Sequence, residues 1–301
     1  MNSTTKHIPV LLKETIDGLN LRPGDTVVDA TLGGAGHALE IAKRFGRDIH
    51  IVGIDVDGAS LRRAEVKLKK IGAFYSLIHS NFQNLEKILG EKGITRVQGI
   101  YFDLGWSIDQ FESGGRGFSF QKDEPLSMTL GDNAADYKFN AHQIVNEWDE
   151  ENLRSIIESY GEESHAYRIA KGITTARANG TIRTSGQLAE IINSSVPKYY
   201  TWRRIHPATK TFQAIRITVN DELNVLKSSL GSAYNVLESG RMVEVISFHS
   251  LEDRIVKRTM RDWDDEEKGK MLTKRPITAS SWETNLNPRS RSAKLRIFQK
   301  K

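Results

Sequence analysis

The 301-residue sequence contains no cysteine. Disulfide bonds, zinc sites with thiolate ligands and cysteine nucleophiles are therefore all excluded. No apolar run approaches the ~18 residues that a membrane-spanning helix needs, and residues 1–10 lack the charged-then-apolar pattern of a signal peptide. We therefore expect a cytoplasmic protein without a membrane partner.

Acidic side chains are scarce in two stretches of the chain. Residues 191–220 hold 5 basic and no acidic side chains, and residues 268–301 hold 10 basic side chains against Glu283 alone. Residues 112–170, in contrast, hold 12 acidic and 5 basic side chains. The modest net charge of +5 is thus unevenly distributed, and the two basic stretches are candidates for contact with an anionic partner.

Strand-like and helix-like segments alternate in the first third of the chain. Runs rich in β-branched residues occur at 26–29, 51–55, 74–78 and 97–103, and a segment with helical character follows each run. Parallel strands need helices on both faces of their sheet. The pattern therefore predicts an α/β fold with a doubly wound, Rossmann-like sheet.

The alternation stops after Asp103, where a glycine-bearing loop and a series of helices begin. We expect helices at 140–148, 151–160, 164–177 and 185–194, the last with Thr184 and Gln187 in capping positions. These form an inserted helical domain at residues 107–208, between two parts of the sheet domain at 1–106 and 209–301. The second part should contain one long helix at about 211–237, a strand at 242–247, a helix at 251–263 and a last strand at 295–298 that pairs with 271–277.

A glycine-rich turn, Gly34-Ala-Gly36, follows the first strand and opens a helix. Such a turn lets backbone N–H groups approach a ligand, although many such turns are only structural. Asp55 ends the second strand 19 residues after Gly36, where an acidic side chain accepts hydrogen bonds from ribose hydroxyls. The alternative role, capping a helix, suits Asp57 better.

The turn lacks the third glycine of the dinucleotide fingerprint, which disfavours a nucleotide-dependent oxidoreductase. S-adenosyl-L-methionine has no pyrophosphate and needs no such glycine. His37, next in the turn, is either a polar wall of the site or the helix start. Phe82, after the third strand, is either an adenine-facing ring or a core residue.

Asp103 ends the fourth strand beside the expected switch point of the sheet, where reactive centres of such folds commonly lie. Further motifs then make a resemblance specific. They are His7-x-Pro-Val-Leu-Leu-x-Glu14, Arg116-Gly-Phe-Ser-Phe120, Tyr160-Gly-Glu162, His206-Pro-Ala-Thr209, Thr211-Phe-Gln-Ala214 and Ser247-Phe-His-Ser-Leu-Glu-Asp-Arg254. In this order and spacing, the chain resembles the bacterial 16S ribosomal RNA cytidine N4-methyltransferases from Lys6 to about Ile297.

The resemblance implies a class I methyltransferase that uses S-adenosyl-L-methionine to methylate N4 of a decoding-centre cytidine in 16S rRNA of the small ribosomal subunit. It places cofactor contacts on Gly34, Ala35, Gly36, His37, Asp55, Phe82, Asp103 and Gln110. The chain departs from the family pattern at Trp106, Ile108 and Ser127-Met-Thr-Leu130. Trp106 would either stack on a flipped base or fill a gap.

Methylation of cytosine at carbon 5 ordinarily requires a cysteine that attacks the ring, so nitrogen or oxygen is the expected acceptor. Asp103 is the candidate catalytic residue, as an ionised acceptor near the cofactor and the target amine. His249 and Asp253 would border the same cleft, with a helix-start role as the alternative for Glu252 and Asp253. No metal-ligand motif is recognised.

Basic and aromatic residues alternate within 198–210, a pattern typical of single-stranded RNA contact. The expected RNA-binding residues are Arg203, Arg204, Lys210, Arg289 and Arg291; the alternative is a merely solvated charged face. No DNA partner is expected. A non-enzymatic ribosome-assembly factor with the same RNA surface remains the main alternative function, ahead of an oxidoreductase.

Overall fold

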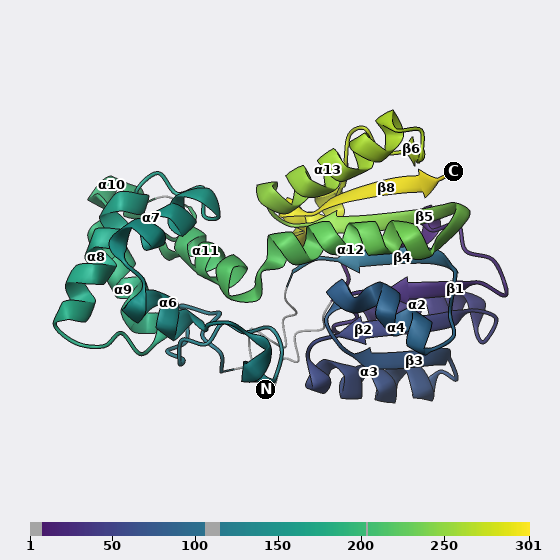
Figure 1. Cartoon of the computed structure of the whole chain (residues 1–301), viewed down its shortest axis with the longest axis horizontal. Coiled ribbons are helices and arrows are strands. Elements are labelled where there is room, and N and C mark those ends of the chain that lie inside the picture. Colours follow the sequence, from purple (N-terminus) through teal and green to yellow (C-terminus); the bar gives the residue numbers. More distant parts are fainter. Residues whose placement is uncertain (1–7, 106–114, 203) are drawn as a thin grey trace. The chain divides into compact units, whose positions relative to one another are not determined.

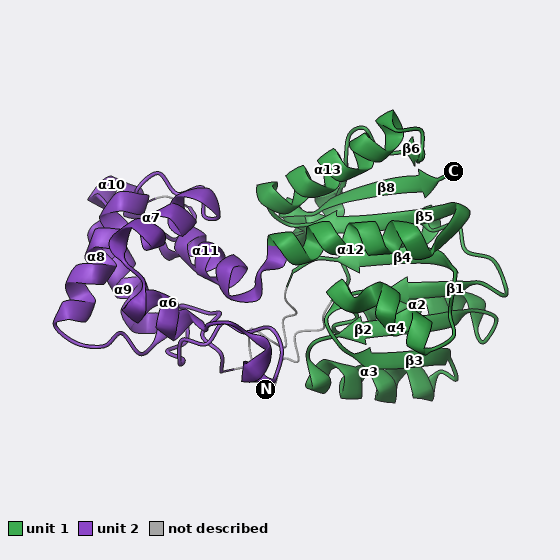
Figure 2. Cartoon of the chain, in the orientation of Figure 1, with its two compact units in different colours: residues 1–107, 223–301 green, residues 108–222 purple. Residues whose placement is uncertain are grey.

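The computed structural model describes residues 8–105, 115–202 and 204–301. The chain divides into two compact units, residues 1–107 with 223–301 (unit 1) and residues 108–222 (unit 2), coloured separately in Figure 2. Within the described ranges, no helix has the length and apolar character needed to cross a membrane.

Unit 1 is built on one sheet, to which the described residues contribute eight strands in the order β3-β2-β1-β4-β5-β8-β6, with β7 paired to β8 (Figure 1). The strands are β1 (Thr26–Asp29), β2 (His50–Asp55), β3 (Phe74–His79), β4 (Val97–Asp103), β5 (Leu237–Ser247), β6 (Gly269–Met271), β7 (Ile277–Thr278) and β8 (Lys294–Lys300). β1 to β5 pair in parallel and β8 pairs antiparallel with β5. The chain order reverses between β1 and β4, which makes this gap the switch point of the sheet.

Helices cover both faces of this sheet. The helices of unit 1 are α1 (Leu12–Gly18), α2 (Gly36–Phe45), α3 (Gly58–Lys70), α4 (Leu85–Glu91), α12 (Glu222–Val236), α13 (Ser250–Asp265) and α14 (Ser281–Leu286). Val27 joins the core formed with α1, α2 and α3, whereas its neighbour Val28 joins the core formed with α4, α12 and α13. Successive strand side chains point to opposite faces, so apolar residues at both positions require the two helical layers, as the sequence predicts.

Unit 2 contains helices packed around one apolar core. They are α6 (Ala141–Glu147), α7 (Glu150–Ser159), α8 (Ala166–Ala178), α9 (Ser185–Ser195), α10 (Lys198–Thr201) and α11 (Ala208–Asn220). The predicted capping residues of α9 are confirmed, since Thr184 and Gln187 bond reciprocally to each other's backbone N–H groups. Helix starts are predictable because the capping hydrogen bonds are local.

The single helix predicted at 211–237 is wrong. α11 ends at Asn220, Asp221 adopts a left-handed backbone with φ of 49°, and α12 begins at Glu222. The Asn220 side chain forms hydrogen bonds with the backbone of Met128 and Leu130. These bonds hold the end of α11 to an earlier segment of unit 2. Unit 2 extends to Glu222. The insertion expected from the sequence ended earlier, at residue 208.

The second half of the sheet also differs in detail from the expected strands. β5 begins at Leu237, which pairs with Val97, instead of at residue 242. The expected antiparallel partner of the last strand is split between β6 and β7, which both pair with β8. The chain therefore closes the sheet with β8 between β5 and two short strands.

Candidate functional site

Three aspartates stand at the carboxyl ends of neighbouring strands in unit 1. Asp29 ends β1, Asp55 ends β2 and Asp103 ends β4. β1 lies between β2 and β4 in the sheet, so the fold brings these carboxyl groups, well separated in sequence, to one edge. Ligands of open α/β sheets bind at this edge, beside the switch point.

The turn between β1 and α2 is shaped by residues that leave little room for side chains. Gly33 and Ala35 have left-handed φ values of 47° and 61°, and Ala35 is fully buried. A Cβ atom on Gly36 would collide with the Pro9 ring. No side chain caps the start of α2, and the first turn of a helix is where backbone N–H groups can face a ligand.

Asp55 is held in place by the backbone around it. Its two carboxylate oxygens accept hydrogen bonds from Gly33 N at 2.7 Å and from Asp57 N at 2.8 Å. Burial raises the pKa of Asp55 to about 6, although both hydrogen bonds oppose that shift. Each oxygen keeps a lone pair for a further donor, as a ribose contact requires.

Asp57 has the structural role expected for it. Its side chain accepts hydrogen bonds from Ser60 N at 3.1 Å and Ser60 Oγ at 2.6 Å, and so caps α3. The capping prediction for Asp57 is confirmed, and capping therefore gives no reason to assign Asp55 to the same duty.

Asp103 carries the least satisfied carboxyl group at this edge. Its Oδ1 atom is buried and has no hydrogen-bond partner within residues 8–105, 115–202 and 204–301, and its Oδ2 lies 3.7 Å from His37 Nδ1. Burial, together with the charges of Asp29 and Glu252, raises the pKa of Asp103 to about 8. Near neutral pH this group is therefore largely protonated unless a cation binds beside it.

His37 lies inside the protein, next to Asp103. Its Nε2 atom is 3.1 Å from the Val10 carbonyl oxygen, to which it must donate, and the residue is only 4% exposed. Nδ1, the other ring nitrogen, faces Asp103. His37 is thus both part of the first turn of α2 and a buried polar neighbour of the candidate site.

Phe82 and the loop after β4 complete the sequence-based cofactor set. Phe82 opens a short 3-10 turn after β3 and packs edge-to-face on Phe102, with ring centroids 5.6 Å apart. It is half-buried, so packing against the core leaves part of the residue accessible. Gln110, Trp106 and Ile108 lie outside the described residues.

Two acidic residues near Asp103 were not among the site residues expected from the sequence. Asp29 accepts a 2.6 Å hydrogen bond from Tyr101, and burial raises its pKa to about 7. Glu252, 4% exposed, accepts hydrogen bonds from the backbone of Phe248 and His249. A charged residue at the end of a buried strand was a usable signal for Asp29, whereas Glu252 resembles an ordinary capping residue.

His249 and Asp253 each make a structural contact within unit 1. His249 is the N-cap of α13 and forms a capping box with Glu252. Asp253 pairs with Arg296 at 2.6 Å and Lys294 at 3.2 Å. Burial acts to raise the pKa of Asp253, but the two cations outweigh burial and lower it. This pairing favours the structural alternative for Asp253 over a place in the cleft.

The basic stretch of unit 2 is only partly available to a ligand. Tyr199 and Trp202 are 57% and 80% exposed, but Tyr200 is buried, and its hydroxyl group donates to Glu163 at 2.6 Å. Tyr200 is therefore not one of the stacking rings expected there. Arg204 is exposed, while the Lys210 ammonium donates to the Glu162 carbonyl.

The remaining predicted RNA contacts are distributed unevenly. Arg289 and Arg291 are exposed on a 3-10 turn of unit 1 (Pro288–Ser292). Arg203 lies outside the described residues. These arginines and the basic stretch thus belong to different units, each with its own basic surface.

Comparison with known proteins finds one family whose model spans residues 4–301, described as the MraW methylase family. A protein of Symbiobacterium thermophilum named ribosomal RNA small subunit methyltransferase H is 42% identical, over 98% of this chain and 96% of its own. Proteins of the same name from Clostridioides difficile and Clostridium botulinum are 39% and 41% identical, each over 98% of this chain and over 98% and 99% of their own.

Proposed function

Because this chain belongs to the MraW methylase family, we propose that it transfers a methyl group from S-adenosylmethionine to N4 of a decoding-centre cytidine in 16S rRNA of the small ribosomal subunit. Relatives that match along nearly their whole length are named as small-subunit rRNA methyltransferases. The structural observation that carries the proposal is the buried Oδ1 atom of Asp103 at the switch point of the sheet, which has no hydrogen-bond partner among the described residues. We further propose that the protein acts in the cytoplasm.

The residues at the sheet edge suit the chemical groups of this cofactor. Asp55 has lone pairs left for the ribose hydroxyls. Gly34, Ala35 and Gly36 lead into the uncapped start of α2, and the partly accessible Phe82 offers an aromatic face to the adenine. The cationic amino-acid end would pair with Asp103 Oδ1, for which the described part of the chain offers no hydrogen-bond donor. His37 and Gln110 complete the proposed cofactor set.

When bound, S-adenosylmethionine supplies an electrophilic methyl group on a sulfonium ion, whose C–S bond breaks as the new C–N bond forms. The exocyclic amine of cytosine is a poor nucleophile because its lone pair conjugates into the ring. The site must therefore hold the amine in line with the methyl group. An ionised Asp103 that accepts a hydrogen bond from the amine would weaken that conjugation and stabilise the positive charge that develops on nitrogen.

The charge of Asp103 would then depend on what is bound. A carboxyl group with a pKa of about 8 is mostly neutral in the ligand-free protein at pH 7. A cation placed beside it lowers the pKa and favours the ionised form. Asp103 would thus become an effective hydrogen-bond acceptor only when the cofactor is present.

The chain's lack of cysteine supports nitrogen over carbon 5 as the methyl acceptor. An assembly factor without turnover remains the alternative that the departures at Trp106 and Ser127 allow. The contacts of Ser127 at the second departure stay within unit 2. Its hydroxyl group forms a 3.0 Å hydrogen bond with the Thr129 hydroxyl, and its backbone N–H donates to the Arg116 carbonyl. An oxidoreductase is disfavoured because the dinucleotide fingerprint is incomplete.

The proposal is tested by incubating the protein with methyl-labelled S-adenosylmethionine and unmethylated small subunits, followed by digestion of the RNA to nucleosides. We expect the label on N4 of one cytidine. Label on carbon 5 would refute the acceptor assignment, and cofactor binding without any transfer would favour the assembly factor.

A further inference from the structure

A groove lies between α8 and α9 of unit 2, and none of its lining residues is among those assigned above to cofactor or RNA. It has a volume of about 560 Å³. Its α8 side includes Tyr167, Arg168 and Lys171, and its α9 side includes Ser194 and Ser195. None of its lining residues is acidic.

The groove exists because two helices approach closely at a glycine. A Cβ atom on Gly172 would collide with Ser195 Oγ, so no larger side chain fits at this crossing. The side chains on either side of Gly172 then form the walls. Arg168 and Lys171 are three residues apart on α8 and therefore neighbours on one face.

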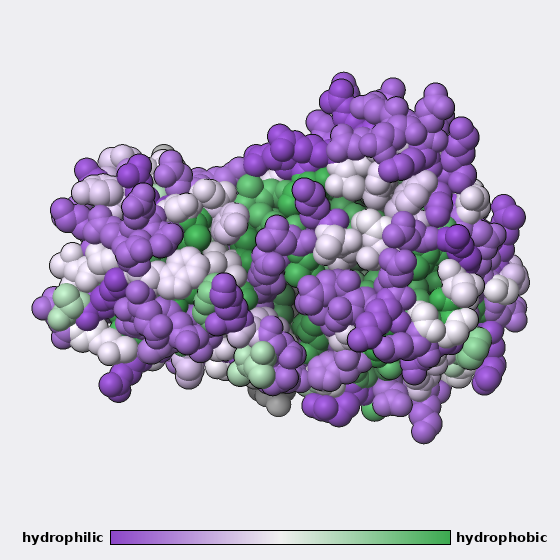
Figure 3. Space-filling view, viewed as in Figure 1, coloured by the Kyte–Doolittle hydropathy of each residue, from purple (hydrophilic) through white to green (hydrophobic). Residues whose placement is uncertain are grey.

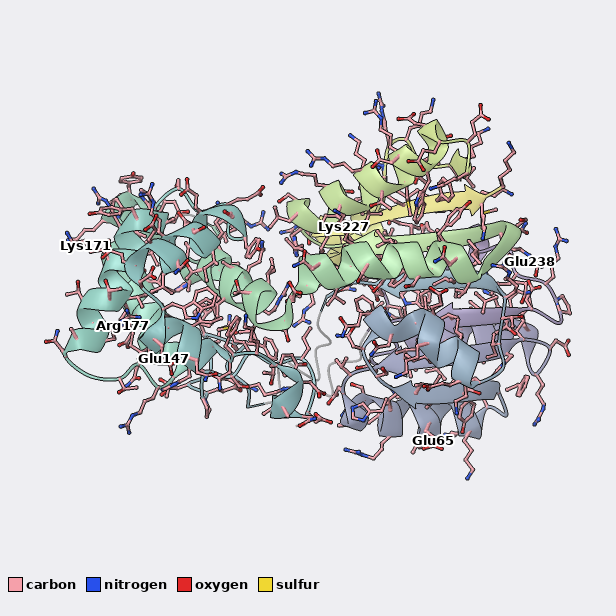
Figure 4. All side chains as sticks on the ribbon, in the orientation of Figure 1. Glu65, Glu147, Lys171, Arg177, Lys227 and Glu238 are labelled. Atoms are coloured by element: carbon pink, nitrogen blue, oxygen red, sulfur yellow. The ribbon has the colours of Figure 1, made fainter. Side chains whose placement is uncertain are left out.

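The two cations of the groove are exposed and have no ion-pair partner among the described residues. Lys171, labelled in Figure 4, projects from α8. The face of unit 2 that Figure 3 shows is mostly hydrophilic. Two exposed cations in a lining without acidic residues favour an anionic occupant of the groove.

An aromatic ring accompanies these charges. Tyr167 is 52% exposed, and the Arg154 guanidinium lies 5.8 Å from its ring centroid. α9 leads directly into α10, which carries the exposed Tyr199 and is followed by Trp202. Exposed rings beside unpaired cations are the combination that proteins use for single-stranded nucleic acid, where bases stack and phosphates pair.

We propose that the α8–α9 groove binds a single-stranded segment of RNA, with Arg168 and Lys171 on its phosphates and Tyr167 stacked on a base. This inference rests on the proposed function, since it assigns a second contact surface for the same RNA substrate. It differs from the basic stretch at 198–210, because none of its lining residues belongs to that stretch.

The test compares two double variants of the full-length protein. Arg168→Gln with Lys171→Gln removes both cations but keeps good helix formers. The control, Lys69→Gln with Lys70→Gln, removes two exposed charges from the end of α3 in unit 1, which lies at the opposite edge of the sheet from the three aspartates. A swap, Arg168→Lys with Lys171→Arg, retains the charges.

The first measurement is binding of a labelled single-stranded oligoribonucleotide of about 16 nucleotides across a salt series. Two lost phosphate contacts should lower the salt slope by about 1.4 and weaken binding about 10- to 30-fold at 0.1 M salt. Tyr167→Ala should weaken binding about 10-fold, whereas Tyr167→Phe should not. The control and the swap should bind as the unaltered protein does.

The second measurement is methylation of unmethylated small subunits at saturating S-adenosylmethionine. We expect the groove variant to raise KM for subunits about 10-fold with kcat and cofactor affinity unchanged. An unchanged salt slope and KM in a protein that does methylate would refute the groove and leave the proposed function standing. Weaker subunit binding with unaltered oligoribonucleotide binding would also refute it, in favour of a ribosomal protein as occupant.

Failure of the proposed function has a separate signature. If the unaltered protein transfers no label to small subunits, the rRNA methyltransferase assignment is wrong. The oligoribonucleotide salt series then still decides whether the groove binds RNA.

Discussion

The hydroxyl group of Tyr101 donates a 2.6 Å hydrogen bond to the buried carboxyl group of Asp29. The two residues stand on neighbouring parallel strands and pair in register, Asp29 on β1 and Tyr101 on β4. Asp29 is 2% exposed. Burial and the adjacent Asp29 raise the pKa of Tyr101 well above its ordinary value, and Asp103, two residues after Tyr101, raises it further. This hydrogen bond therefore links β1 and β4, the two strands that carry Asp29 and Asp103.

Loss of the Tyr101 hydroxyl should destabilise the protein. In Tyr101→Phe the Asp29 Oδ2 atom keeps its burial but loses its donor, which should cost about 1–3 kcal/mol in free energy of unfolding. Denaturant titration measures this change. Asp29→Asn is the matched control, because an amide oxygen still accepts the bond. Equal stability of Tyr101→Phe and the unaltered protein would show that the bond is energetically neutral.

Replacement of Asp55 by alanine should weaken S-adenosylmethionine binding. Two hydrogen bonds to a charged acceptor together contribute roughly 2–4 kcal/mol, or about 30- to 1000-fold in dissociation constant. Calorimetry of the folded variant gives this number. Asp57→Ala removes a helix cap at the same turn and should leave the affinity nearly unaltered. A folded Asp55→Ala variant with normal affinity would remove Asp55 from the cofactor site.

Asp103→Asn separates binding from chemistry, because it keeps the shape and one acceptor oxygen but removes the charge. The catalytic role predicts a single-turnover rate about 100-fold lower at saturating cofactor, equivalent to about 2.7 kcal/mol in the barrier. The cofactor role predicts a weaker cofactor affinity. We expect both losses. A saturated rate equal to that of the unaltered protein, with binding reduced, would eliminate the catalytic role.

Cofactor affinity should rise with pH. Burial raises the pKa of Asp103 to about 8 in the ligand-free protein, and the ionised form is the one that a cation stabilises. Below pH 8 a proton must leave on binding, so the affinity should rise by up to about 10-fold per unit as pH increases from 7 to 8 and then level off. Calorimetry in two buffers of different ionisation enthalpy detects the released proton. In Asp103→Asn the release should shrink; release of equal size there would assign it to another group.

Removal of the basic residues at 203–210 should reduce the salt dependence of RNA binding. If Arg203, Arg204 and Lys210 each contact a phosphate, the triple alanine variant loses about 2 from the slope, at roughly 0.7 per single-strand contact. Cofactor affinity should not change. Because Lys210 already donates to the Glu162 carbonyl, Arg203→Ala with Arg204→Ala should account for most of the effect. A slope equal to that of the unaltered protein would identify these residues as a solvated face.

The order of strands and helices in the first third of the chain was predictable because its signals are short-range. Val27 and Val28 are apolar neighbours in a strand, which only a sheet buried on both faces accommodates. Helix starts such as Thr184 with Gln187 follow from hydrogen bonds across one turn. In contrast, the break at Asp221 has only a weak local signal, an aspartate that tolerates the left-handed backbone, and the contacts of Asn220 with Met128 and Leu130 hold the helix end there.

The sheet, the glycine turn, the absence of cysteine chemistry and the positions of Asp55 and Asp103 at strand ends could all be predicted from the sequence. These features depend on periodicity, residue type and spacing, which a linear chain displays directly. Which acidic groups are charged could not be predicted, because it depends on the folded chain. Folding buries Asp103 Oδ1 where no described residue donates to it, gives Asp29 the Tyr101 hydroxyl and pairs Asp253 with Arg296. Ionisation depends on desolvation and on neighbours in space, and neither exists until the chain has folded.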